Sequence, residues 1–298
     1  MAWRRLPLVR NQGCFSLKER TRWCALFVEG DVMWQFMLSA GRAGLRSRSI
    51  QSILILGALL VGIAYLSASF SPRQPQTVAL DVGFSGLRIT LVLFSLFWVQ
   101  ELVAREIERR TVLFSLTYPV PRGRYIVGRY LGVLGLLALA ALLLGLLLWV
   151  VVLSLGKGYA QGFPVVLGLP YWSTVAGLWV DAAVVAAFAL WVSTFSTVPM
   201  LPLALGLAFA VGGKSLGAVA EYLARGADGD PALMRFAPII DAIQWVLPDL
   251  SRLDFRAWPM YDLAPASQAV GLGLLMATSY AALLLTLAVM TFTRRDFE

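Results

Sequence analysis

A long uncharged and Leu-rich stretch of this chain, Tyr130–Leu155, restricts the possible folds more than any other feature. It runs for 26 residues without an Asp, Glu, Lys or Arg. About 20 apolar residues are enough for a helix to cross a bilayer core about 30 Å thick. Of the 298 residues, 59% are hydrophobic and 14% are charged, whereas a soluble domain usually carries about a quarter charged residues. The sequence therefore predicts an integral membrane protein.

Apolar runs of similar character recur along the rest of the chain. We expect an all-α integral membrane protein with six transmembrane helices, near residues 50–70, 84–103, 130–155, 172–195, 198–213 and 270–292. Together they would make residues 50–298 a single six-span transmembrane domain. The long charged stretch before the first span, with no cleavage site after it, argues against a secretory signal.

The residues before the first span divide into two expected parts. Apolar and basic side chains share a helical pattern over 33–49, which predicts an amphipathic helix lying in the cytoplasmic interface. The alternative is a simple extension of the first span into the cytosol. Residues 1–32 form a polar, basic extension, expected to be disordered or the product of a misassigned start, because Met33 opens a more typical membrane-protein beginning.

The distribution of Lys and Arg predicts the orientation. Residues 1–49, the loop at 105–129 and the C-terminal tail together carry 17 of the 25 basic residues. Basic loops face the cytoplasm, so we expect both termini there, in a bacterial inner membrane, with residues 214–266 outside. The net charge of +8 is accounted for by contact with anionic lipid, and no nucleic-acid partner is expected. Prolines and tryptophans within 214–266 predict short broken helices on the outer side before the sixth span.

The sequence carries no recognisable catalytic set. It contains no His, and Cys14 and Cys24 have no metal-ligand spacing, so both are expected to be reduced thiols. The GGKS at Gly212–Ser215 lacks the first glycine of a phosphate-binding loop, because Ala208 stands there, and no strand precedes it. We therefore expect a protein that is not an enzyme and that has no cofactor, metal or nucleotide site of its own.

Asp181 is the intramembrane polar candidate, inside the fourth span. A charged side chain at the centre of a bilayer costs about 2.5–3.5 kcal/mol on insertion scales. One interpretation is a role in handling substrate or protons. The other, which we favour, is a structural hydrogen bond or ion pair, for which Arg88 in the second span is a possible partner.

The loop between the second and third spans combines charge with a short apolar run. Val112, Leu113, Phe114 and Leu116 lie between flanking arginines and a Pro-x-Pro break at Pro119 and Pro121. Apolar side chains in an aqueous loop should not remain bare in water. Either a soluble partner docks on this loop, or the loop forms an interfacial helix that lies on lipid.

This loop resembles that of the permease subunits of type-2 ABC exporters. The matching positions are Glu106, Arg110, Thr111, Leu116, Pro119, Arg122, Gly128, Arg129 and Gly132. The C-terminal part is similar as well, in the sequence WVLPDLSRLDF at 245–255 and the ending FTRRDFE after the last span. The resemblance covers residues 33–298, and residues 1–32 have no counterpart.

The resemblance implies a set of partners and a coupling element. In that family the permease works as a homodimer, or pairs with a related permease, and binds two copies of an ABC ATPase that carries ATP and Mg. The loop after the second span would contain the coupling helix, seated in a groove of the ATPase. The implied coupling residues are Arg109, Arg110, Thr111, Val112, Leu113, Phe114, Leu116, Pro119, Arg122 and Arg124.

The expected function is therefore that of a membrane-spanning permease subunit of an ABC exporter, driven by ATP hydrolysed on a separate chain. The alternative is a secondary transporter or channel that works alone. That alternative predicts repeats, broken helices near the midplane or several ionisable residues in the spans. The sequence does not identify the substrate.

Overall fold

The fold is an all-helical bundle. The computed structural model describes residues 48–71, 73–104, 122–155, 165–196, 198, 200–224, 243 and 247–294, and none of these lies in a strand. Six helices within those ranges are long and apolar enough to cross a membrane, which confirms the predicted fold class. They are α2 (Arg48–Ser69), α3 (Pro75–Val99), α6 (Arg122–Leu155), α7 (Leu169–Phe195), α8 (Leu201–Ala224) and α12 (Ser267–Arg294).

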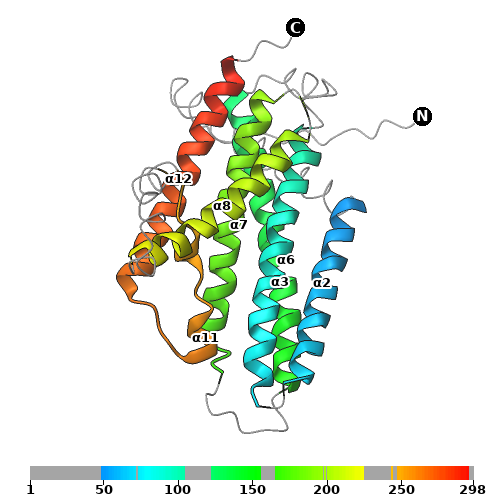
Figure 1. Cartoon of the computed structure of the whole chain (residues 1–298). Helices are drawn as coiled ribbons and strands as arrows, with labels where there is room; N and C mark the ends of the chain where they lie inside the picture. The colour runs from blue at the N-terminus through cyan, green and yellow to red at the C-terminus, as the bar shows by residue number, and fades with distance from the viewer. Residues whose placement is uncertain are drawn as a thin grey trace, which may run out of the picture.

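Helix α7 occupies the centre of the bundle. It contacts α3, α6, α8 and α12, and most of its side chains are buried (Figure 1). A helix that is apolar on all sides is typical of such a position, because it has no face that must meet water. Helix α2 packs mainly against α3 at one side. The helices α2, α8 and α12 leave most of their apolar surface uncovered, as expected of helices that face lipid or another protein.

Three helix boundaries differ from the sequence-based expectation. Helix α6 begins at Arg122, about two turns before the expected start at residue 130. Helix α3 begins at Pro75, about two and a half turns before the expected start near residue 84, with proline at a position that suits the first turn of a helix. Helix α8 continues past Lys214, where the span was expected to end, and finishes at Ala224. All three expectations placed charged residues outside the spans. In α3 and α8 the structure keeps Asp81 and Lys214 within the helices, paired with Arg256 and Asp254.

The segment before α12 folds back into the bundle. It contains a short 3-10 helix, η3 (Leu250–Leu253), and a short α-helix, α11 (Ala257–Tyr261), so broken helices do occur before the last span. Helix η3 contacts α7, α8 and α12, which places it among the long helices. Glycines allow this close approach: a Cβ added at Gly177 of α7 would lie 2.5 Å from the Leu253 carbonyl oxygen.

The ends of α3 and α6 that border the 105–121 loop lie at the same end of the bundle as the end of α12 (Figure 1). A π-helical turn, η1 (Gln100–Ala104), completes α3 there. The Tyr125 ring at the start of α6 stacks on Phe292 near the end of α12, with 5.8 Å between ring centroids. The expected extension at 1–32 and almost all of the expected interfacial helix at 33–49 lie outside the described residues, and α2 begins at Arg48.

Candidate functional site: a partly buried ion network beside a cleft

Asp181 lies halfway along α7 and is paired with Arg88 of α3. One carboxylate oxygen, Oδ2, is 2.7 Å from Arg88 Nη2, and the two side chains are 3% and 11% exposed. The structure therefore contains the ion pair that was the favoured interpretation of Asp181. Because α7 starts at Leu169, Asp181 is about 18 Å from the beginning of its helix, deeper than the sequence-based span boundaries placed it.

Asp254, just after η3, joins this pair to a third helix, α8. Its Oδ2 is 2.7 Å from Lys214 Nζ of α8 and 3.5 Å from Arg88 Nη1. Its Oδ1 accepts a hydrogen bond of 2.8 Å from Arg256 Nε. One carboxylate on the folded-back segment thus meets cations from α3, α8 and its own segment.

Arg256 extends the network towards the start of α3. Its Nη1 is 3.0 Å from the Ser85 hydroxyl oxygen and 3.3 Å from Asp81 Oδ1. The adjacent Phe255 carbonyl accepts a 3.1 Å hydrogen bond from the Thr174 hydroxyl of α7. These contacts fix the folded-back segment to both α3 and α7.

The ion network has no net formal charge. It comprises three carboxylates and three cations, namely Asp81, Asp181, Asp254, Arg88, Lys214 and Arg256. Burying a charge away from water is tolerated when an opposite charge and hydrogen bonds compensate it. Within the described part of the chain the compensation is incomplete, because Arg88 Nη1 and Asp181 Oδ1 are buried without a hydrogen bond.

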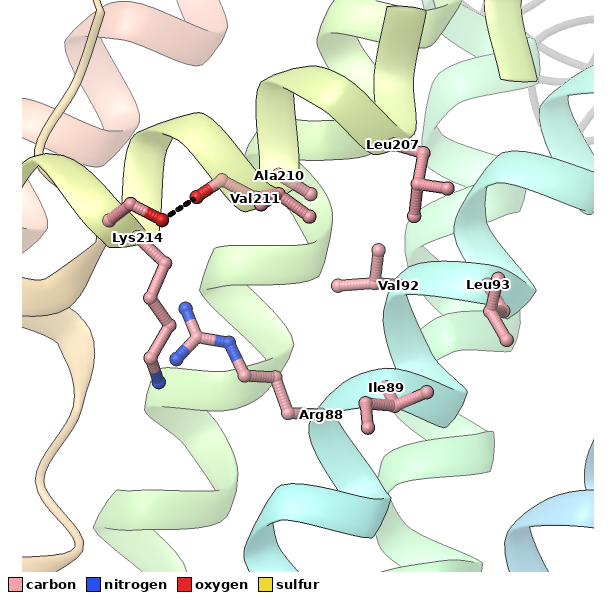
Figure 2. Close-up of a pocket in the computed structure, with 9 residues that line it drawn as sticks. Arg88, Ile89, Val92, Leu93, Leu207, Ala210, Val211 and Lys214 are labelled. Carbon is pink, nitrogen blue, oxygen red and sulfur yellow. Dashed lines mark hydrogen bonds between the residues drawn. The ribbon is translucent and has the colours of Figure 1, made fainter. Parts of the chain in front are cut away.

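A cleft of about 270 Å³ between α3 and α8 adjoins the network. Its walls are apolar, with Ile89 and Val92 on α3 and Leu207 and Val211 on α8 among them. Figure 2 shows the Arg88 and Lys214 side chains entering the same space between the two helices. The cleft lining therefore includes two cations but none of the three carboxylates that pair with them.

The described residues offer no metal centre: no group of three or more His, Cys, Asp or Glu side chains among them is placed to hold an ion. The network can hold helices together and can present positive charge to the cleft. A general base aimed at a nucleophile is not part of this arrangement in the described ranges.

Of the expected coupling residues, only Arg122 and Arg124 lie among the residues that the structure describes. Arg122 is the first residue of α6, and Arg124 lies in the first turn of the same helix, partly buried. The others, which fall between Arg109 and Pro119, lie outside the described residues. Their predicted contact with an ATPase stays a prediction.

Four members of the ion network were missed or misplaced by sequence reasoning. Lys214 was expected just beyond the end of the fifth span, on the outer side, while Asp81, Asp254 and Arg256 had no assigned role. A partial signal existed, because Arg88 and Asp181 are charges inside apolar spans and have to be compensated. Nothing in chain spacing indicates that a segment about 75 residues after Asp181 returns to the same place.

The chain was then compared with known proteins. It is 34% identical over 118 residues to a Pseudomonas aeruginosa protein named "Probable ABC transporter permease protein NosY". A protein of the same name from Stutzerimonas stutzeri is 32% identical over 117 residues. The resemblance to ABC transporter permeases is thereby confirmed.

The similarity to these permeases is partial in extent. The matched part is 38% of this chain and 42% of the Pseudomonas aeruginosa permease, and 37% and 42% for the Stutzerimonas stutzeri permease. No family model matches the chain. Six membrane-length helices in the described ranges make it a multi-pass membrane protein, as a permease must be.

Proposed function

We propose that this chain is the membrane-spanning subunit of an ABC exporter, and that it moves its substrate across the bacterial inner membrane with energy from a separate ATPase. The observation that carries the proposal is the sequence similarity to ABC transporter permeases over 118 residues. The six apolar helices are consistent with it, and the chain has no phosphate-binding loop of its own.

The partner ATPase would dock on the loop between α3 and α6. Both helix ends that border this loop lie together at one end of the bundle, so a protein bound there would act on both helices (Figure 1). The π-helical turn η1 directly precedes the loop, and such turns occur frequently at functional sites. Under this proposal two permease chains form a homodimer, and each binds one ATPase. When ATP brings the two ATPases together, α3 and α6 of each permease transmit that motion to the bundle.

The composition of the loop supports an apolar contact with the ATPase that is flanked by charged residues. Val112, Leu113, Phe114 and Leu116 supply apolar surface, and the flanking arginines can pair with carboxylates of the partner or with lipid phosphates. Pro119 and Pro121 each fix φ, which limits the slack between the loop and α6. The positive-inside pattern of the sequence favours a cytoplasmic location for this end of the bundle, where ATP is found.

A substitution in the loop tests the proposal. Phe114→Asp would place a charge in the presumed apolar groove, and we expect it to release the ATPase or to uncouple ATP hydrolysis from transport. The measurement is copurification of the ATPase with the tagged permease, together with its ATP hydrolysis rate in the complex. Phe70→Asp is a matched control, because Phe70 is 86% exposed between α2 and α3, at the other end of α3.

The permease itself should still insert and dimerise with Phe114→Asp, since the loop lies between spans and not within them. Size-exclusion chromatography in detergent checks this point. If the variant retains its ATPase at the wild-type ratio and hydrolyses ATP in a coupled manner, the loop is not the coupling element.

The ion network favours one second candidate, a secondary transporter that works without an ATPase. Such transporters place ionisable residues near the middle of the membrane, as Arg88 and Asp181 are placed here. The two candidates differ in their energy source. A transporter of this kind would move its substrate with an ion gradient and no ATP, and no ATPase would copurify with it.

A further inference from the structure

The charged and the apolar side chains that line the cleft between α3 and α8 are separated from one another. The cationic groups of Arg88 and Lys214 lie together at one end of its lining, while the rest of the lining is apolar apart from Ser215 (Figure 2). The Ser215 hydroxyl donates a 2.8 Å hydrogen bond to the Val211 carbonyl of its own helix. The groups available to an incoming polar ligand are therefore the two cations.

Both cations have bonding capacity left, on a partly exposed ammonium for Lys214 and on a buried Nη1 for Arg88. Among the described residues Lys214 Nζ donates one hydrogen bond, to Asp254 Oδ2, although an ammonium carries three donors. Arg88 uses Nη2 for Asp181, while its Nη1 is 3.5 Å from Asp254 Oδ2 and makes no hydrogen bond in the described part of the chain. Since the paired carboxylates do not line the cleft, a ligand there meets positive charge first.

The mouth of the cleft suits hydrocarbon. Ile89 and Val211 border it and are 54% and 60% exposed, so they would meet acyl chains in a membrane. Further along α3 and α8, on the side away from Arg88 and Lys214, Leu96 packs onto Gly206 and closes the gap between the helices. A volume of about 270 Å³ is slightly below the usual range of about 300–1,000 Å³ for ligand pockets. It accepts a head group with the first part of a chain, and the rest of the chain would remain outside.

We propose that the cleft between α3 and α8 binds an amphipathic anion, a phosphate or carboxylate attached to an apolar chain, with the charge on Arg88 and Lys214 and the chain along Val92, Leu207 and Val211. The inference rests on the proposed function where it makes such a molecule the cargo. The same chemistry is present in a membrane lipid, so the two sources must be separated by experiment.

The depth of the site helps to separate these two sources. Arg88 is the fourteenth residue of α3, about 20 Å from its first residue, which places it near the middle of the span. Lipid head groups lie outside the hydrocarbon core, about 15 Å from its centre when the core is about 30 Å thick. An anion bound to Arg88 has left the level of the head groups, as a molecule in transit would.

The test uses the full-length permease alone, in nanodiscs of phosphatidylcholine. The probe is a dodecyl phosphate with a photoreactive diazirine in its chain, and the matched neutral probe is the corresponding dodecanol. We expect saturable labelling of α3 and α8 peptides by the phosphate and about tenfold weaker labelling by the alcohol, because a hydrogen bond to a charged group is worth about one order of magnitude in affinity or more.

Variants locate the binding groups. Lys214→Gln should weaken labelling about tenfold, and Lys214→Arg should restore most of it. Arg252→Gln is the matched control, because Arg252 is an exposed cation of η3 that does not line the cleft. Val211→Trp should block labelling by filling the cleft while leaving the ion network intact, and it serves if Lys214→Gln fails to fold.

Equal labelling by the phosphate and the alcohol, or no loss with either Lys214→Gln or Val211→Trp, would overturn the proposal. Displacement of the probe by phosphatidylglycerol added at ordinary bilayer ratios would support the site and assign it to lipid. Resistance to that lipid would support the site and assign it to cargo. No ATPase is present, so a negative result here leaves the proposed function standing, and a failure of the ATPase experiment leaves this binding result standing.

Discussion

Two carboxylates five residues apart on the folded-back segment have different partners. Asp249 caps η3: its Oδ1 accepts hydrogen bonds from the Ser251 amide and hydroxyl, and Arg252 beside it is 60% exposed. Asp254 instead meets cations from α3 and α8. The first carboxylate stabilises a local turn, and the second ties together elements that are far apart in the sequence.

This difference indicates which ion pairs matter for the stability of the fold. An exposed pair such as Arg252–Asp249 gains little, about 0–1 kcal/mol, because water screens it and long side chains lose freedom. A buried pair such as Arg88–Asp181 contributes little net stability when intact, yet removal of one partner leaves an uncompensated charge. Breaking the buried pair should therefore cost far more stability than breaking the exposed one.

The largest effect is expected from Arg88→Leu. It would leave Asp181 buried without its cation, and we expect the free energy of unfolding to fall by about 3–5 kcal/mol. Denaturant unfolding of the purified permease in detergent measures this value. The double variant Arg88→Leu with Asp181→Leu should recover most of the loss, since no unpaired charge remains at that pair. A single variant as stable as the wild type would show that the pair is not a structural contact.

A steric change should come next. Gly177→Ala would bring a Cβ to 2.5 Å from the Leu253 carbonyl oxygen, so the folded-back segment must shift. We expect a loss of about 1–3 kcal/mol in the same unfolding measurement. Gly135→Ala in α6 is the matched control, because no heavy atom beyond its own helix lies within 4 Å of the added Cβ, and it should be neutral or slightly stabilising.

A milder effect is expected from Asp181→Asn. The amide oxygen can still accept a hydrogen bond from Arg88, and Asp254 remains 3.5 Å from the same guanidinium. We expect a loss of about 1 kcal/mol, with the ATPase still bound and most transport retained. A collapse of transport in a correctly assembled complex would instead assign Asp181 to the handling of substrate or protons.

Arg252→Gln should have the smallest effect. Its partner Asp249 keeps the two hydrogen bonds from Ser251, so the η3 cap stays satisfied. We expect the free energy of unfolding to change by less than about 1 kcal/mol. A change as large as that of Arg88→Leu would remove the distinction between the local and the long-range carboxylate.

Much of the fold could be predicted from the sequence, because apolar length alone identifies spans. Tyr130–Leu155 identified α6, and the other spans were found with errors mainly at charged residues. The expected start of α3 lay after Asp81 and the expected end of α8 lay before Lys214, so both charges were left outside the spans. In the structure these charges are paired within the bundle, so they do not interrupt the helices.

The site was predictable only in part. Asp181 was singled out because a charge in a span needs compensation, and Arg88 was the candidate partner. Asp254 and Arg256 could not be found in that way, because they belong to a segment that returns to the bundle through tertiary contacts. The segment packs against the small residue Gly177, and its Phe255 carbonyl accepts a hydrogen bond from the Thr174 hydroxyl. Neither contact can be predicted without knowing where the segment lies.

We propose that this chain is the permease of an ABC transporter, and one measurement tests this proposal most directly. The tagged permease is purified from its native membrane in mild detergent, and the copurified proteins are identified and quantified by mass spectrometry. The account predicts an ATPase with a phosphate-binding loop in a one-to-one ratio with the permease, and loss of that ATPase or of coupled ATP hydrolysis with Phe114→Asp. A permease that is purified without any ATPase and still transports on an ion gradient would contradict the account.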